Sequence, residues 1–189
     1  MENRYIHIHQ ELIDACRAGH RNAQYEIYKR YYKAMYNTSL RIVNNSAEAE
    51  DIMQESFLDA FQRLDSYTGE GSFGSWLKRI VINRSLDSLR KTKETLSIEE
   101  NGIDLPEEQE DDHEDETLYQ VAEVKRAISQ LPGDCRVILS LFLLEGYDHE
   151  EISQILNISN QLSRTRYSRA RQKLAGMLKG NNRHAFSTN

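Results

Sequence analysis

The chain has 189 residues, 39% of them hydrophobic, which is enough for one or two small domains with a modest core. Two prolines and nine glycines leave long stretches without helix breakers, so we expect an all-α fold. Cys16 and Cys135 are far apart and form no CxxC pair, which argues against a disulfide framework and favours a reducing cytoplasm. We find no signal peptide and no apolar run of about 18 residues, so we expect no contact with a membrane.

The net charge of −6 is unevenly distributed. Residues 97–117 hold eleven acids and no Lys or Arg, and the rest of the chain has 24 basic residues against 19 acids, a net charge of +5. Hydrophobic periodicity also fails there, so we expect a flexible acidic linker over 96–117. The linker is either a solvated tether or an acidic strip that competes with nucleic acid for a basic groove, or follows one on a partner.

Residues 8–95 are expected to form a helical domain, with helices over 10–16, 22–43, 47–64 and 73–91. Asn45 or Ser46 can cap the third helix. Its apolar residues repeat at intervals of three and one, which predicts one continuous buried stripe of Ala49, Ile52, Met53, Ser56, Phe57, Ala60, Phe61 and Leu64. The second helix offers as core positions Tyr25, Tyr28, Tyr32, Met35, Leu40 and Val43.

Residues 118–179 are expected to form a second helical domain, followed by a tail over 180–189. We expect helices over 118–130, 135–145 and 149–156, and a final helix over about 159–179. Leu131, Pro132 and Gly133 end the first of these helices. Asp134 is expected to cap the second, and Gly146 to end it.

The strongest functional pattern is a helix, a short turn and a second helix over 149–179. The inward faces are expected to carry Ile152, Ile155, Leu156, Tyr167, Ala170, Leu174 and Leu178, with Ile158 in the turn. The opposite face carries Arg164, Thr165, Ser168 and Arg169, with Arg166, Arg171 and Lys173 alongside. A helix that docks in the major groove needs this division of apolar and donor residues. The alternative is a solvated basic helix on a bundle.

A second pattern lies at 73–93, where six basic residues face one acid, Asp87. Aromatic residues stand at or just before its start (Tyr67, Phe73 and Trp76), and one helical face holds Arg79, Asn83, Asp87 and Arg90. Cations among aromatic rings and an amide suit unpaired bases. The spacing of Phe73 and Trp76 with Leu77 and Ile80 favours the alternative, in which both rings belong to the core.

The outward face of the helix over 47–64 is the third pattern, with Asp51, Gln54, Glu55, Leu58, Asp59 and Gln62. An acidic, amide-bearing stripe with one exposed leucine suits a basic helical partner, although such a stripe is more often an ordinary solvated face. The six histidines have no metal-ligand spacing, and no phosphate loop or nucleophile motif occurs. We therefore expect no metal, cofactor or catalytic residue.

Three motifs, in this order, resemble the sigma-70 family of RNA polymerase factors. Residues 49–57 (AEDIMQESF) resemble its region 2 helix, and residues 72–83 (SFGSWLKRIVIN) the adjoining promoter-melting segment. The segments that resemble region 4 are Leu131-Pro132, residues 146–152 (GYDHEEI) and residues 168–174 (SRARQKL). The similarity is to the two-domain extracytoplasmic-function (ECF) group and covers about 10–95 and 118–178.

The resemblance implies a region 2 four-helix-type bundle over 8–95 and a region 4 helix-turn-helix over 118–179. It implies that core polymerase binds Asp51, Gln54, Glu55 and Leu58. The melted −10 element would contact Tyr67, Trp76, Lys78, Arg79, Asn83, Arg84 and Arg90, with Asn83 at the position that meets a flipped-out base. The duplex −35 element would contact Asn160, Arg164, Thr165, Arg166, Ser168, Arg169 and Arg171.

These similarities favour a cytoplasmic, non-catalytic initiation subunit that is a monomer when free. Its partners would be core RNA polymerase, promoter DNA and, where one exists, an anti-sigma factor. Residues 161–163 (QLS) replace the Gly-Thr-Val or Ser-Thr-Ser run of many members, which bears on the promoter sequence rather than the role. Two alternatives remain: a stand-alone helix-turn-helix regulator with a palindromic site, and a nucleic-acid enzyme whose linker carboxylates bind a metal.

Overall fold

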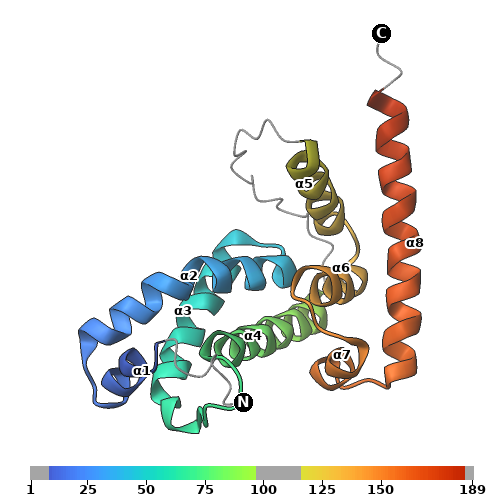
Figure 1. Ribbon diagram of the computed structural model, residues 1–189. Coiled ribbons are helices and arrows are strands. Elements are labelled where there is room, and N and C mark those ends of the chain that lie inside the picture. Colours follow the sequence, from blue (N-terminus) through green and yellow to red (C-terminus); the bar gives the residue numbers. More distant parts are fainter. Residues whose placement is uncertain (1–8, 97–115, 186–189) are drawn as a thin grey trace, which may run out of the picture. The chain divides into compact units, whose positions relative to one another are not determined.

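The computed structural model describes residues 9–96 and 116–185, and these are helical with short connections and contain no strand (Figure 1). The expected all-α class is confirmed. Contacts divide the chain into two compact units, residues 1–106 and 107–189. Residues 97–115, most of the predicted acidic linker, lie outside the described ranges, as do residues 186–189 of the predicted tail. No helix within the described ranges is long and apolar enough to cross a membrane.

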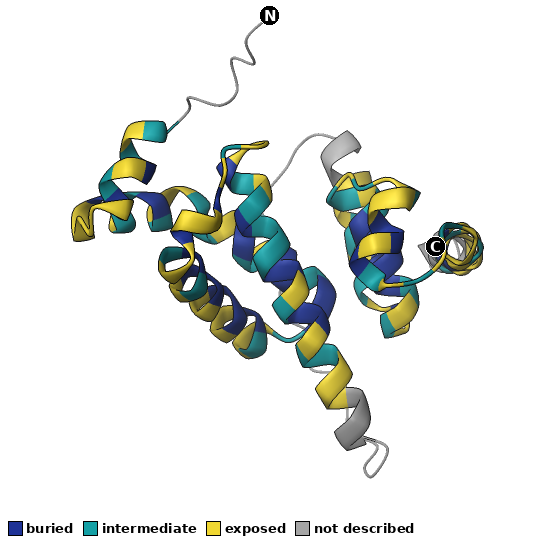
Figure 2. Cartoon of the chain, turned by 90° about the horizontal axis from the view of Figure 1, so that it is seen from below, coloured by how far each residue is buried: buried dark blue, intermediate teal, exposed yellow. Residues whose placement is uncertain are grey.

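The first unit is built on three helices that pack against one another, α2 (Arg21–Val43), α3 (Ser46–Gln62) and α4 (Phe73–Leu96). The short helix α1 (Gln10–Arg17) packs on α2, and a 3-10 turn (Leu64–Ser66) follows α3. Figure 2 shows that the buried faces of these helices turn toward each other while their outer faces are exposed. The core of the unit therefore lies between α2, α3 and α4.

The amphipathic pattern predicted for α3 is confirmed. Asn44 ends α2 in a left-handed conformation (φ 60°), and the side chain of Asn45 caps α3 by accepting a hydrogen bond from the backbone N–H of Glu48 at 2.9 Å. Phe61 is half-buried, and the other members of the predicted stripe are buried: Ala49, Ile52, Met53, Ser56, Phe57, Ala60 and Leu64.

The core face predicted for α2 is partly wrong. The side chain of Tyr25 is 61% exposed, and Tyr28 and Tyr32 stack on each other half-buried. Met35 and Val43 are buried as predicted, and the rest of the buried face is made of Ala23, Ile27, Thr38, Ser39 and Ile42. Close packing explains the difference, because the Ser85 hydroxyl of α4 donates to the Val81 carbonyl (2.8 Å) and lies 3.0 Å from Ser39 Oγ. Small hydroxyl groups that are satisfied in this way can be buried where two helices meet.

Gly74 allows the first turn of α4 to lie against a tyrosine ring. A Cβ atom at residue 74 would lie 3.0 Å from Cε1 of Tyr31, whose ring packs on Phe73 with centroids 5.5 Å apart. We expect Gly74→Val to lower the free energy of unfolding of this unit by about 1–3 kcal/mol through overpacking. Denaturation followed by the fluorescence of Trp76, the single tryptophan, measures this loss.

The control for this change is Gly176→Val in the second unit, where a Cβ atom would meet nothing within 4 Å. Valine has a somewhat higher helix propensity than glycine, so this variant should keep the stability of the second unit or raise it by less than about 1 kcal/mol. Far-UV circular dichroism follows its unfolding. Equal losses for the two variants would contradict the overpacking argument.

The second unit consists of α5 (Glu116–Ser129), α6 (Gly133–Leu139), a π-turn (Ser140–Leu144), α7 (His149–Leu156) and α8 (Asn160–Ala185). Helices α5, α6 and α7 each contact α8. The prediction that Asp134 caps α6 is wrong, because Pro132 holds the N-cap position and Asp134 lies in the first turn. The final helix also continues to Ala185, into the segment expected to be a tail.

Polar side chains and a left-handed residue define both ends of α7 and the start of α8. Asp148 and Glu151 form a capping box at the start of α7, and Asn157 ends that helix in a left-handed conformation (φ 53°). The Ser159 hydroxyl then accepts a hydrogen bond from the N–H of Leu162 in the first turn of α8 (3.1 Å). The predicted inward faces are confirmed, since Ile152, Ile155, Ala170 and Leu174 are buried and Leu156, Ile158, Tyr167 and Leu178 half-buried.

Candidate nucleic-acid interface

The exposed face of α8 forms a shallow depression that faces solvent. Its lining is Gln161, Arg164, Thr165, Ser168, Arg169 and Gln172. Residues three or four apart share one face of a helix, so the α8 backbone alone brings these side chains together. Four of them were predicted to read the −35 element. The two glutamines were missed, although their spacing from Thr165 and Ser168 placed them on the same face.

The remaining predicted −35 residues lie around this depression. Arg166 and Arg171 are exposed but do not line it. Asn160 is half-buried in the first turn of α8 and makes two hydrogen bonds, to Glu150 of α7 and to Arg164. The depression therefore presents guanidinium, amide and hydroxyl groups, the donor set that reads base edges and phosphates.

His149 lies in an aromatic cluster beneath this face. Its ring centroid is 4.8 Å from that of Phe142 and 5.4 Å from that of Tyr167, and its Nδ1 lies 3.0 Å from the hydroxyl of the fully buried Ser163. Burial and the nearby charge of Arg164 lower the pKa of His149, while Asp148 acts in the opposite direction. This packing role was not predicted from the sequence.

The lowered pKa of His149 predicts a pH-dependent stability for the second unit. As the pH falls through the ordinary value of 6.5, His149 takes up a proton in the unfolded chain before it does so in the folded one. The free energy of unfolding is therefore highest above that pH and decreases below it. We expect His149→Phe to flatten this loss between about pH 7 and pH 5. Denaturation followed by near-UV circular dichroism measures it, with His20→Gln in the first unit as control. Parallel curves for the wild type and His149→Phe would contradict the prediction.

The residues predicted to contact the −10 element lie on or just before α4, with different degrees of access. Asn83 and Arg90 are exposed, and Arg90 pairs with Asp87 at 2.9 Å. Half-buried positions are held by Trp76, Lys78, Arg79 and Arg84. The Asn83 amide is therefore open to a ligand on the outer face of α4.

The aromatic residues before and at the start of α4 pack together. Tyr67 is 4% exposed, and its hydroxyl donates to the Gly71 carbonyl at 2.9 Å. Burial raises the pKa of this phenol. The Trp76 ring lies 5.5 Å from that of Tyr67 and 5.4 Å from that of Phe73, measured between centroids. The core interpretation is confirmed for Phe73, which is buried, whereas Trp76 keeps part of its surface accessible.

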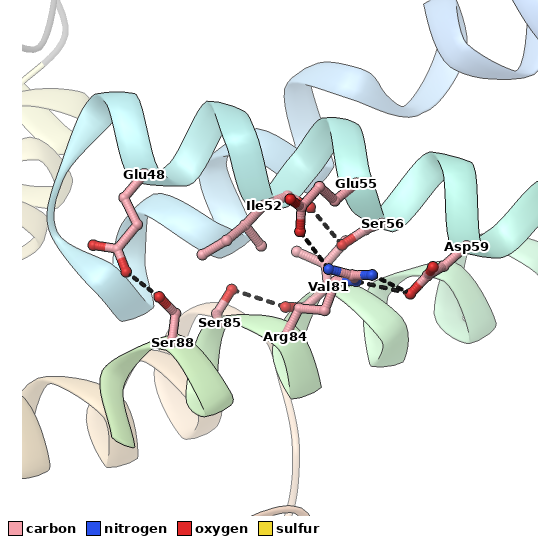
Figure 3. Close-up of polar contacts among 9 residues, drawn as sticks. All are labelled: Glu48, Ile52, Glu55, Ser56, Asp59, Val81, Arg84, Ser85 and Ser88. Carbon is pink, nitrogen blue, oxygen red and sulfur yellow. Dashed lines mark hydrogen bonds and ion pairs between the residues drawn. The ribbon is translucent and has the colours of Figure 1, made fainter. Parts of the chain in front are cut away.

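A second polar cluster joins α3 to α4 (Figure 3). The Arg84 guanidinium pairs with Glu55 and donates to Asp59 Oδ2 through Nε (2.8 Å) and Nη2 (2.6 Å). One turn further along, Ser88 bonds to Glu48. Arg84 is predicted to contact DNA and Glu55 to bind polymerase, and the structure brings these two side chains into contact. The cluster therefore connects the two predicted binding faces.

The outward face of α3 carries the four residues predicted to bind polymerase. Asp51, Gln54, Glu55 and Leu58 are all exposed. Leu58 is 63% exposed, although it is a large apolar residue. An exposed leucine among carboxylates suits a partner that presents both basic and apolar groups.

Comparisons with known proteins agree with this architecture. The Sigma-70 region 2 family matches residues 27–95, and the Sigma-70, region 4 family matches residues 122–174. The chain is 30% identical over 182 residues to the ECF RNA polymerase sigma factor SigW of Bacillus subtilis, covering 88% of this chain and 95% of that protein. It is 28% identical over 180 residues to the ECF RNA polymerase sigma factor SigM of Mycobacterium tuberculosis, covering 89% and 83%.

Solved structures share the fold. One is the sigma factor RpoE of Bartonella quintana in complex with the anti-sigma factor NepR, at a TM-score of 0.64 and 20% identity, covering 82% of this chain and 95% of that one. Another is CnrH in complex with the cytosolic domain of CnrY, at a TM-score of 0.55 and 20% identity, covering 90% and 96%.

The chain belongs to the ECF group of sigma-70 family RNA polymerase sigma factors. Members of this family are transcription initiation subunits without catalytic activity, so the chain is not an enzyme.

Proposed function

We propose that this sigma factor directs core RNA polymerase to promoters by reading a duplex −35 element with α8 and opening the −10 element at α4. In this proposal residues 8–95 act as region 2 and residues 118–179 as region 4, joined by the acidic segment over 96–117. The bases of the −10 element would meet the outer face of α4 at Trp76, Lys78, Arg79, Asn83 and Arg90.

The observation that carries the proposal is the division of α8 into two faces. The inward face is held by Ala170 and Leu174, whereas the outward face gathers the six donor-bearing residues of the depression. A helix supported from behind by α7 and carrying such donors in front has the form of a helix that enters the major groove. Arg166 and Arg171 at its flanks are suited to phosphates.

The direct test mixes the full chain with core RNA polymerase and a library of promoter DNA. We expect a stable holoenzyme and initiation from a subset of sequences that share two short elements. Absence of both holoenzyme and specific initiation would refute the proposal. Tight binding of the chain alone to a palindromic duplex would instead favour a stand-alone regulator.

The exposed amide of Asn83 predicts a defect confined to promoter opening. We expect Asn83→Ala to reduce open-complex formation about tenfold or more, since a buried base edge left without its partner costs roughly 1–3 kcal/mol. Permanganate footprinting of the −10 region measures opening, and a gel shift with the −35 duplex is the control that should not change. Normal promoter opening by Asn83→Ala would show that the flipped-out base is bound by other residues.

The outward face of α3 is the proposed contact with core polymerase, through Asp51, Gln54, Glu55 and Leu58. The charge and exposure of these residues support this assignment. Since one of the similar structures is a sigma factor in complex with an anti-sigma factor, NepR, we also propose that an anti-sigma factor controls this chain. The proposed place of action is the cytoplasm, where the polymerase works.

A further inference from the structure

A chain of hydrogen bonds runs from α7 to the DNA-reading face of α8. The Asn160 Nδ2 group donates to Glu150 Oε2 at 2.9 Å, and the Asn160 Oδ1 atom accepts from Nε of Arg164 at 2.8 Å. Glu150 lies in the first turn of α7, outside the residues that line the depression. Its carboxylate is nevertheless connected through a single amide to Arg164, which lines the depression.

The chemistry of the three groups fixes the direction of this chain. A carboxylate only accepts hydrogen bonds and a guanidinium only donates them. The amide between them therefore has one satisfactory orientation, with its NH₂ group toward Glu150 and its oxygen toward Arg164. If Glu150 were absent, the amide could turn over and present a donor to another donor, and the side chain of Arg164 would lose its support.

The contact with Asn160 also determines which edge of Arg164 is offered to DNA. With Nε bonded to Asn160, the guanidinium presents its two terminal nitrogens, Nη1 and Nη2. Two parallel donors are the arrangement that bonds O6 and N7 of guanine. A single donor, or a mobile guanidinium, would satisfy a phosphate equally well and carry little sequence information.

We propose that Glu150 is a positioning residue that sets the guanine preference of Arg164 through Asn160. The inference rests on the proposed −35 reading by α8. The competing explanation is that Glu150 only stabilises the N-terminus of α7 by its negative charge. Glu151, the next residue, makes a structural contribution of that kind through the capping box and is the matched control.

The test uses the full chain with core polymerase and a promoter library randomised over the −35 element, with bound sequences counted. Arg164→Ala should lose the preference for guanine at one position. Glu150→Ala and Asn160→Ala should each reduce that preference at the same position by at least about threefold, with Glu150→Gln intermediate. Glu151→Ala should leave the preference unchanged. In the Arg164→Ala background, Glu150→Ala should have no further effect on preference.

The outcomes separate this inference from the function on which it rests. A selective loss with Arg164→Ala but an unchanged preference with Glu150→Ala would overturn the positioning role alone. A change caused by Glu150→Ala that persists in the Arg164→Ala background, or that is uniform across all positions, would also overturn it. A uniform loss with Arg164→Ala would overturn both base reading by Arg164 and the inference. Helix content by circular dichroism verifies that each variant is folded.

Discussion

Truncation of Leu77 to alanine is expected to lower the free energy of unfolding of the first unit by about 2–5 kcal/mol. Leu77 is fully buried on α4, between the cluster around Phe73 and the crossing of α4 with α2 at Ser85. The loss combines the apolar surface returned to water with the cavity left behind. Because a small domain has a total stability of about 5–15 kcal/mol, the variant should unfold at a much lower denaturant concentration. Trp76 fluorescence reports the transition.

The same substitution at Leu58 provides the matched comparison. Leu58 is 63% exposed on α3, so its truncation should change the stability by no more than about 0.5 kcal/mol. If α3 binds core polymerase, Leu58→Ala should weaken holoenzyme formation about fivefold, equivalent to ~1 kcal/mol. Fluorescence anisotropy of the labelled chain titrated with core polymerase measures this affinity. Unchanged affinity would show that this face of α3 lies outside the interface.

Substitution of Arg164 or Arg169 by alanine is expected to cost about 1–3 kcal/mol on a matched −35 element and much less on other sequences. Both side chains line the depression on α8, where a guanidinium can form two bonds to one base. The measurement is a titration of holoenzyme against matched and mismatched duplexes at fixed salt, because phosphate contacts depend on ionic strength.

Arg166→Ala is the comparison for these two variants. Arg166 is exposed on the same helix but does not line the depression. We expect its loss to weaken binding to all sequences alike and to reduce the salt dependence of binding by about one counterion. A sequence-independent loss for Arg164→Ala or Arg169→Ala would mean that those arginines also hold phosphates.

The sequence predicted the fold best where large apolar residues follow a regular period. The α3 stripe and the inward face of α8 were predicted residue by residue, because burial there depends on one helical face. The face of α2 was predicted less well, because tyrosines were assigned to the core whereas Thr38 and Ser39 are among its buried residues. A buried hydroxyl depends on a partner from another helix, as with Ser85, and the local pattern does not contain that information.

The candidate sites divide in the same way. The −35 face of α8 follows from spacing along one helix, so its members were predicted except for Gln161 and Gln172. Contacts between residues far apart in the chain were not predicted. Arg84 meets carboxylates 25 and 29 residues away, and His149 meets Ser163 across the turn. Such pairs depend on how helices cross, which periodicity within a single helix does not specify.

The caps and cross-helix bonds around the turn between α7 and α8 bear on how such factors could be recombined. Side-chain hydrogen bonds join the two helices, between His149 and Ser163 and between Asn160 and Glu150. A chimera that replaced α8 alone would remove Ser163 and Asn160 and so break both bonds, leaving His149 and Glu150 without these partners. The unit to exchange is therefore the whole segment from the Asp148 cap through α8. An engineered hybrid intended to change promoter choice should receive α7 and α8 together.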